Sequence, residues 1–162
     1  MKTVVLVRHG KSSWDFDVTD RERPLKPRGK SDAKLVVNQF IKNSEAPSNI
    51  FSSPAKRALN TCKIFIKALN LSENSIKVEE ELYDFGGESV INFIKNLPDS
   101  YSDIMIFGHN HAFTSISNIF GSIFIDNLST SGLVKITFEV DSWREIKSGR
   151  TQLILVPKEL KE

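Results

Sequence analysis

Two short apolar runs, each ending directly at a histidine, most constrain what this chain can fold into. The first is Val4-Val5-Leu6-Val7, followed by Arg8-His9-Gly10, and the second is residues 104–107, followed by Gly108-His109. Continuous apolar runs of this length are typical of strands buried on both faces of a parallel sheet. Parallel strands end at one edge of the sheet, where α/β folds bind ligands. The two histidines are therefore predicted to share one site.

Strand-like and helix-like segments alternate along the chain. We expect parallel strands at residues 3–7, 50–51, 76–78 and 103–107. We expect helices at 28–42 (from Arg28-Gly29 or from Ser31), after Pro54, at 89–97, and from His111 or Ala112 to Phe120. Residues 11–27 lack periodicity and are predicted to form a loop. Gly132–Val140 alternates apolar and polar residues, and a last strand is expected at 152–156, which indicates antiparallel pairing. The predicted class is α/β, a three-layer α/β/α fold with a mostly parallel central sheet and antiparallel edge strands near the C-terminus.

Apolar residues at helical spacing define the faces that two of these helices should bury. They are Ala33, Val36, Val37, Phe40 and Ile41 in the first helix, and Ala58, Leu59, Cys62, Ile64, Phe65 and Leu69 in the helix after Pro54. Pro54 suits the first turn of that helix, with Ser53 as its cap. Cys62 is expected to be buried and inert.

Length and composition predict one domain over residues 1–162, which we expect to be a cytoplasmic monomer. The net charge of +2 is too small to indicate a nucleic-acid partner. No apolar run approaches the roughly 18 residues that a membrane-spanning helix needs, and the N-terminus lacks a signal-peptide pattern. The single cysteine excludes an internal disulfide and fits a reducing compartment.

The residues beside the two histidines suit the transfer of a phosphoryl group. A neutral imidazole is nucleophilic near neutral pH, so a histidine held against phosphorus can form a covalent phospho-enzyme. The planar guanidinium of Arg8 matches the geometry of phosphate oxygens, and Arg57, after Ser52-Ser53-Pro54, supplies a second one. Gly10 would let the backbone approach a ligand closely.

In this order, the motifs resemble the histidine phosphatase (phosphoglycerate mutase-like) superfamily, and more closely its short SixA-like phosphohistidine phosphatase branch. Arg-His-Gly alone is a weak tripeptide, but here it follows a strand and precedes the serine-proline-arginine block and Gly-His. The resemblance covers nearly the whole chain, over residues 4–14, 23–29, 52–61, 82–84, 108–110, 143–145 and 157–160.

The resemblance implies a phosphatase that works through a phosphohistidine intermediate and needs no metal or cofactor. Its implied substrate is a phosphorylated small molecule or a phosphohistidine protein. The implied site consists of His9 as nucleophile, of Arg8, Arg57 and His109 around the phosphoryl oxygens, and of Gly10, Ser13 and Asn110 in substrate binding. The chain departs from the family pattern at Asp15, where many relatives have Asn, and at His111, where short relatives often have Pro.

The general acid is left open by the sequence. In larger relatives a Glu protonates the leaving group from the segment that matches Leu82-Tyr83-Asp84, so Asp84 is the first candidate, with Glu88 and Glu81 as alternatives. A phosphohistidine substrate would need less help, because imidazole leaves phosphorus more readily than an alkoxide does. Because no residue matches the acid of the larger relatives fully and the chain is short, we expect activated phosphates as substrates and do not expect a mutase.

Two other functions are kept as alternatives. One is a small-molecule phosphomonoesterase that uses Asp84 as its acid. The other is a non-catalytic phosphate-binding or adaptor module, against which the presence of Arg8, His9, Arg57 and His109 speaks. A metal site at His109 and His111 is not predicted, because no cysteine or carboxylate accompanies them at a usual ligand spacing.

Overall fold

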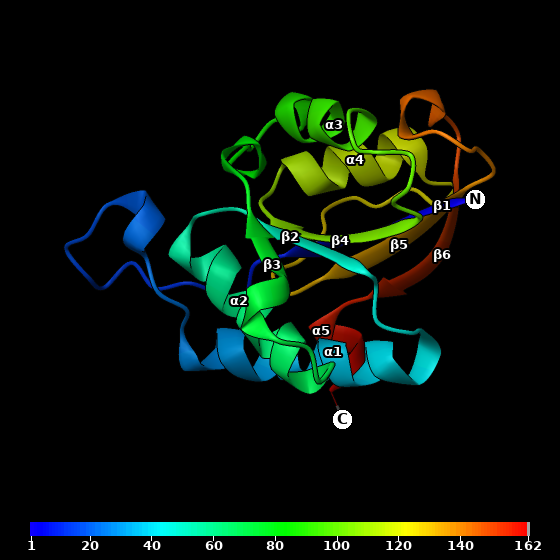
Figure 1. The fold of residues 1–162 in the computed structure, drawn as a ribbon. Coiled ribbons are helices and arrows are strands. Elements are labelled where there is room, and N and C mark those ends of the chain that lie inside the picture. Colours follow the sequence, from blue (N-terminus) through cyan, green and yellow to red (C-terminus); the bar gives the residue numbers. More distant parts are fainter. Residues whose placement is uncertain (162) are drawn as a thin grey trace.

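The computed structural model describes residues 1–161, and it shows one six-stranded sheet between two layers of helices (Figure 1). The strands lie in the order β3-β2-β4-β1-β5-β6. The first four in this order are mutually parallel, whereas β5 and β6 are antiparallel to their neighbours. Their bounds are Lys2–Arg8 (β1), Asn49–Ser52 (β2), Ile76–Val78 (β3), Asp103–Gly108 (β4), Leu133–Phe138 (β5) and Arg150–Leu155 (β6). The predicted fold class is confirmed.

The helices divide between the two faces of the sheet (Figure 1). One face is covered by α1 (Pro27–Asn43), α2 (Lys56–Ala68) and the short α5 (Pro157–Leu160), and the other by α3 (Glu88–Lys95) and α4 (Ala112–Phe120). Four 3-10 helices that the sequence did not predict lie in the connections: η1 (Asp20–Glu22), η2 (Glu73–Ser75), η3 (Glu80–Leu82) and η4 (Trp143–Glu145).

The apolar run of β1 is buried on both sides, as its sequence predicts. Side chains alternate along a strand, so Val4 and Leu6 pack into the core under α3 and α4, whereas Val5 and Val7 pack into the core over α1 and α2. Every position from 4 to 7 therefore removes apolar surface from water, and this fixes β1 in the centre of the sheet.

Several local predictions were wrong in detail. Helix α1 begins at Pro27, whose fixed φ suits the first helical position. The side chain of Ile41 is exposed, because it lies beyond the buried stripe that ends at Phe40. Helix α2 begins at Lys56 with Ala55 as its cap residue, so Ser53 does not cap it.

The register of β1 against β4 brings the two histidine segments together. Arg8 is paired with Gly108, and the backbone N–H of His9 donates to the carbonyl oxygen of Gly108 at 3.0 Å. A Cβ at position 108 would lie 2.7 Å from the Phe113 ring, so the close approach of α4 requires glycine there. His9 and His109 are thus neighbours at the carboxyl edge of the sheet.

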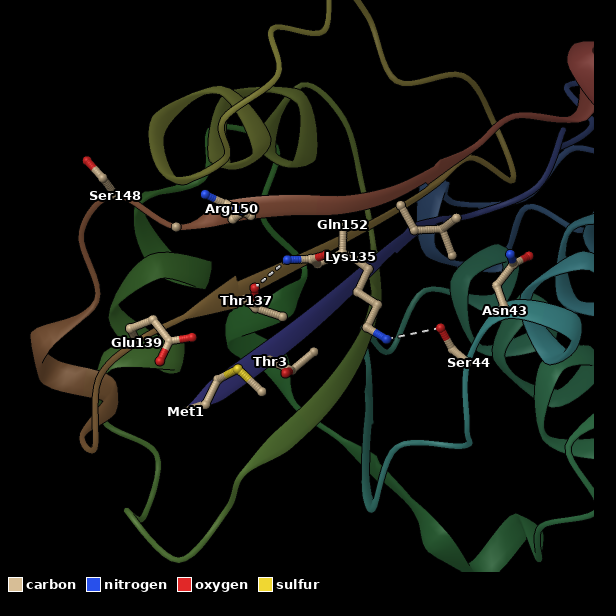
Figure 2. A pocket seen from close by; sticks show the side chains of 12 residues that line it. Met1, Thr3, Asn43, Ser44, Lys135, Thr137, Glu139, Ser148, Arg150 and Gln152 are labelled. Carbon is tan, nitrogen blue, oxygen red and sulfur yellow. Dashed lines mark hydrogen bonds between the residues drawn. The ribbon is translucent and has the colours of Figure 1, made fainter.

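A polar groove of about 920 Å³ lies at the opposite end of these strands (Figure 2). It is lined by the start of β1, by β5 and β6 and by the end of α1, and the Nζ of Lys135 donates to Ser44 Oγ inside it. None of the predicted site residues lines this groove. Within residues 1–161, no helix combines the length and the apolar character that crossing a membrane requires.

Candidate active site

The ring of His9 is oriented by the backbone that follows it. Its Nδ1 lies 2.7 Å from the carbonyl oxygen of Gly10, which can only accept, so Nδ1 carries the proton. The other ring nitrogen, Nε2, then holds the lone pair. It faces the guanidinium of Arg57, whose Nε–H donates to it at 3.4 Å. This geometry presents an unprotonated imidazole nitrogen to a cationic group.

Both site histidines are neutral near pH 7. Burial lowers the pKa of His9 to about 3, and the positive charges of Arg57, Arg8 and Arg23 act in the same direction, against the hydrogen bond to Gly10. Burial also lowers the pKa of His109 to about 3, with contributions from His9 and Arg57. Neutral imidazole is the form that can act as a nucleophile.

The ring of His109 lies between that of His9 and the aromatic rings of Tyr83 and Phe85. Its ring centroid is 5.4 Å from that of His9, 5.4 Å from that of Tyr83 and 4.9 Å from that of Phe85. Its Nε2 is 2.8 Å from Ser53 Oγ, and its Nδ1 is buried without a hydrogen-bond partner in residues 1–161. One nitrogen of this buried ring is therefore held by the protein, and the other is available to a ligand.

Arg57 is buried at the start of α2 and is held by the loop before α1. Its Nη1 donates to the backbone carbonyl of Asp20 at 2.6 Å, and its Nη2 donates to the Asp20 carboxylate at 2.9 Å. The Tyr83 hydroxyl and Arg23 also donate to this carboxylate. Burial alone would raise the pKa of the Asp20 carboxyl, but the hydrogen bonds from Tyr83 and Arg57 hold it well below its usual range. Asp20 is thus a negative charge beside the predicted anion site.

Arg8 reaches the same edge from the end of β1. Its Nη1 donates to the carbonyl oxygen of Leu128 at 2.7 Å, and its Nε is buried without a partner in the described chain. The backbone N–H of Ser131 donates to the carbonyl oxygens of both Arg8 and His9, at 3.1 and 3.0 Å. The loop before β5 therefore holds the Arg8-His9 segment in place.

Gly10 and Ser13 both make contacts within the protein that stabilise the loop after β1. The N–H of Gly10 donates to Thr61 Oγ1 at 2.9 Å, and a Cβ at this position would lie 2.8 Å from the carbonyl oxygen of Gly29. The glycine is required for close packing of the loop on α1. Ser13 Oγ accepts the N–H of Asp15 at 3.0 Å, a local turn contact.

Asn110 and His111 lie at the start of α4. The side-chain oxygen of Asn110 accepts from the backbone N–H and the hydroxyl of Thr114, at 3.0 and 2.8 Å. Its amide donates to Asn127 at 2.8 Å, which ties α4 to the loop that holds Arg8. His111 precedes the helix and is exposed.

Asp84 accepts hydrogen bonds at the N-terminus of α3. One carboxylate oxygen accepts from Gly86 N–H at 3.1 Å, and the other accepts from Gly87 and Val90 N–H at 3.0 and 3.1 Å. This arrangement uses the carboxylate as an acceptor, whereas a general acid must hold a proton. Glu81 and Glu88 are exposed and line a groove along α3 together with Asp84.

Several residues of the site were not assigned by the sequence: Asp20, Ser53, Thr61, Tyr83 and Ser131. Thr61 links two predicted residues, since it accepts from Gly10 N–H and donates to the carbonyl oxygen of Arg57 at 2.7 Å. Thr61 closes the Ser52–Thr61 block, and its place one helical turn after Arg57 could have indicated this contact. Asp20 lies in a loop without periodicity, where no local pattern indicated its partner.

The arrangement is suited to bind a tetrahedral anion and to form a bond to its central atom through an imidazole nitrogen. Two guanidinium groups, a buried imidazole nitrogen that has no partner within residues 1–161, and the lone pair of His9 Nε2 lie at one edge of the sheet. Within the described residues, no group of three or more His, Cys, Asp or Glu side chains could hold a metal ion.

The chain is similar to known proteins in sequence and in structure. The sequence matches the histidine phosphatase superfamily (branch 1) over residues 4–88. An uncharacterized protein of Mycobacterium tuberculosis is 24% identical over 158 residues, covering 91% of this chain and 96% of the relative. The structure of the protein histidine phosphatase SixA complexed with tungstate has a TM-score of 0.82 at 22% identity, covering 98% of this chain and 99% of that chain. A mycobacterial glucosyl-3-phosphoglycerate phosphatase has a TM-score of 0.67 at 11% identity, covering 94% and 98% of the two chains.

The family match spans more than half of the chain and contains Arg8, His9 and Arg57. The chain therefore belongs to the histidine phosphatase superfamily, branch 1. It is a histidine-dependent phosphatase, and its fold is that of SixA.

Proposed function

We propose that the protein removes phosphate from its substrate through a phosphohistidine formed on His9. The observation that carries this proposal is the orientation of the His9 ring: its Nδ1–H is bound to Gly10, and its Nε2 lone pair faces the guanidinium of Arg57. In the first step Nε2 attacks phosphorus, a P–N bond forms, and the bond to the leaving group breaks, with its electron pair going to the leaving group. In the second step water attacks phosphorus, the electron pair of the P–N bond returns to Nε2, and one proton of the water passes to the solvent.

The roles of the other residues follow from the charge that develops on the phosphoryl oxygens. Arg8 Nε, the Arg57 guanidinium and His109 Nδ1 would donate to these oxygens, and such donors act most strongly where water is excluded. Asn110 and Gly10 would keep the loops around them in place. No metal or cofactor is needed, because His9 supplies the nucleophile. We also propose that residues 1–162 act as one domain, as a monomer in the cytoplasm.

Two observations favour a phosphohistidine-bearing protein as the substrate. First, the Asp84 carboxylate is occupied as an acceptor of backbone N–H groups at the N-terminus of α3, so the site offers little proton donation to a poor leaving group, whereas imidazole is a good one. Second, aromatic side chains are exposed beside the site: Phe85 against His109 is 45% exposed, and Trp14, whose ring lies against Arg23, is 75% exposed. Exposed aromatic groups of this kind are typical of protein contact surfaces.

A small-molecule phosphomonoesterase is the second candidate. It is supported by the likeness to the mycobacterial glucosyl-3-phosphoglycerate phosphatase, which is weaker than the likeness to SixA.

A panel of phosphorylated metabolites and phosphohistidine-bearing proteins separates the candidates, with His9→Ala as the blank. We expect the highest kcat/KM on a phosphohistidine protein and turnover of p-nitrophenyl phosphate. Higher kcat/KM on a metabolite would favour the phosphomonoesterase. Binding of phosphate with no turnover of any substrate would indicate the non-catalytic module.

A further inference from the structure

Ser53 and His109 form a buried pair that none of the assigned roles explains. Ser53 follows β2 and His109 follows β4, the neighbouring strand, and Ser53 N–H donates to the carbonyl oxygen of Phe107 at 2.9 Å. Both side chains are fully buried, and Ser53 Oγ lies 2.8 Å from His109 Nε2. The direction of this hydrogen bond decides which nitrogen of His109 carries its proton.

The surroundings of Ser53 settle the direction. Its Oγ already accepts the backbone N–H of Ala55 at 3.2 Å. If it also accepted a proton from His109 Nε2, the hydroxyl's own proton would have no acceptor among residues 1–161. Unpaired buried polar groups are costly, so the direction that leaves fewer of them is favoured. If His109 donates, both the serine proton and the Nδ1 lone pair lack a partner in residues 1–161, whereas if Ser53 donates, only the Nδ1–H does. This count favours donation from Ser53 to Nε2.

A neutral imidazole that accepts at Nε2 must carry its proton on Nδ1. The Nδ1 of His109 is buried and has no partner in the described part of the chain, while its ring lies beside those of His9 and Phe85. Oxygens of a phosphoryl dianion only accept hydrogen bonds. An N–H at Nδ1 would attract such an oxygen, whereas a lone pair there would repel it.

We propose that Ser53 is a positioning residue that fixes His109 in the Nδ1–H tautomer, so that His109 donates to the phosphoryl group as a neutral imidazole. This inference deepens the proposed function and rests on it for the identity of the ligand. A neutral donor stabilises the transferring group without adding a cation that would repel Arg8 and Arg57, and it needs no protonation step before the substrate binds.

The direct test is a long-range ¹H–¹⁵N correlation spectrum of the histidine rings in phosphate-free buffer, with His109 assigned by the loss of its signals in His109→Gln. We expect a protonated Nδ1 and an unprotonated Nε2 in the wild type, and a movement of the Nδ1–H signal when tungstate is added. In Ser53→Ala we expect a mixture of tautomers. A wild-type ring protonated at Nε2 would overturn the proposal. This outcome is read from the wild-type spectrum and does not depend on Ser53→Ala, so it decides the question even if that variant fails to fold.

Kinetics supply the second readout, with Ser52→Ala as the matched control. Ser52 is an equally buried serine whose hydroxyl donates to the carbonyl oxygen of Ser53 at 2.9 Å and does not contact His109. We expect Ser53→Ala to lower kcat/KM about tenfold, the size of one lost hydrogen bond, with recovery in Ser53→Thr and little change in Ser52→Ala. Equal losses in Ser53→Ala and Ser52→Ala would overturn the proposal. The tautomer is measured without turnover, so a failure of the phosphatase assignment would be distinguishable from a failure of this inference.

Discussion

Asp20 and Arg57 are joined twice: Nη1 of the arginine is 2.6 Å from the backbone oxygen of Asp20, and Nη2 is 2.9 Å from its carboxylate. Arg57 is thereby aimed at His9, but a negative charge is also brought next to the position proposed for the phosphoryl group. The two effects can be separated by a substitution that keeps the hydrogen-bonding shape and removes the charge.

Asp20→Asn should strengthen competitive inhibition by tungstate or vanadate. The amide oxygen can still accept from Arg57, while the repulsion of the anion disappears, so we expect the inhibition constant to fall roughly threefold to tenfold. Asp17→Asn, in the same loop and exposed, is the control. Weaker inhibition in Asp20→Asn would mean that the carboxylate matters mainly by holding Arg57.

Arg57→Ala should have the opposite effect. Loss of a charge-assisted contact to the anion costs about 1.5–3 kcal/mol, so inhibition by the same oxyanions should weaken by one to two orders of magnitude. Lys56→Ala removes the neighbouring exposed cation and should leave the inhibition constant nearly unchanged. If both variants weaken inhibition equally, the effect is that of net charge, and Arg57 lies outside the site.

Asp84→Asn separates acid catalysis from helix capping. A dedicated acid contributes typically 10²–10⁴-fold with a poor leaving group, so an acid role predicts a loss of that size on an alkyl phosphate and a much smaller one on p-nitrophenyl phosphate. From the contacts of Asp84 with Gly87 and Val90 we expect similar, modest losses on both substrates and a lower melting temperature. A large loss confined to the alkyl phosphate would instead establish Asp84 as the acid.

Stability should fall as the pH drops below about 6.5. The pKa of His9 is about 3 in the folded protein, so between these pH values the unfolded chain binds a proton that the native protein does not. At one unit of pKa for 1.36 kcal/mol, His9 should contribute a loss of about 2 kcal/mol in the free energy of unfolding between pH 7 and pH 5. Urea titrations of the wild type and of His9→Gln in phosphate-free buffer measure this, and the variant should lose correspondingly less. The same pH dependence in both proteins would contradict the neutral, buried state of His9.

The sequence predicted those parts of the molecule that depend on local pattern. The central strands and the shared edge of His9 and His109 follow from apolar runs and from the geometry of parallel sheets. The order of the motifs was enough to predict that Arg8 and Arg57 belong to the same site as the two histidines.

What the sequence missed depends on contacts between distant segments. The partnership of Asp20 with Arg57 joins a loop without periodicity to a helix, and only the tertiary fold specifies it. Ser53 was interpreted as a helix cap because serine before proline commonly plays that role, yet α2 begins later and the hydroxyl turns to His109. Asp84 matched a family position by sequence, while its contacts with the N-terminus of α3 become visible only once the helix is placed.

The central claim is that His9 carries the phosphoryl group during turnover. Rapid-quench mass spectrometry of the wild type with p-nitrophenyl phosphate, analysed under conditions that preserve acid-labile phosphate, should find the phosphate on His9. His9→Ala should keep the fold and lose both the label and turnover. Phosphate on Cys62 or on a serine, or turnover that persists in His9→Ala, would contradict the account.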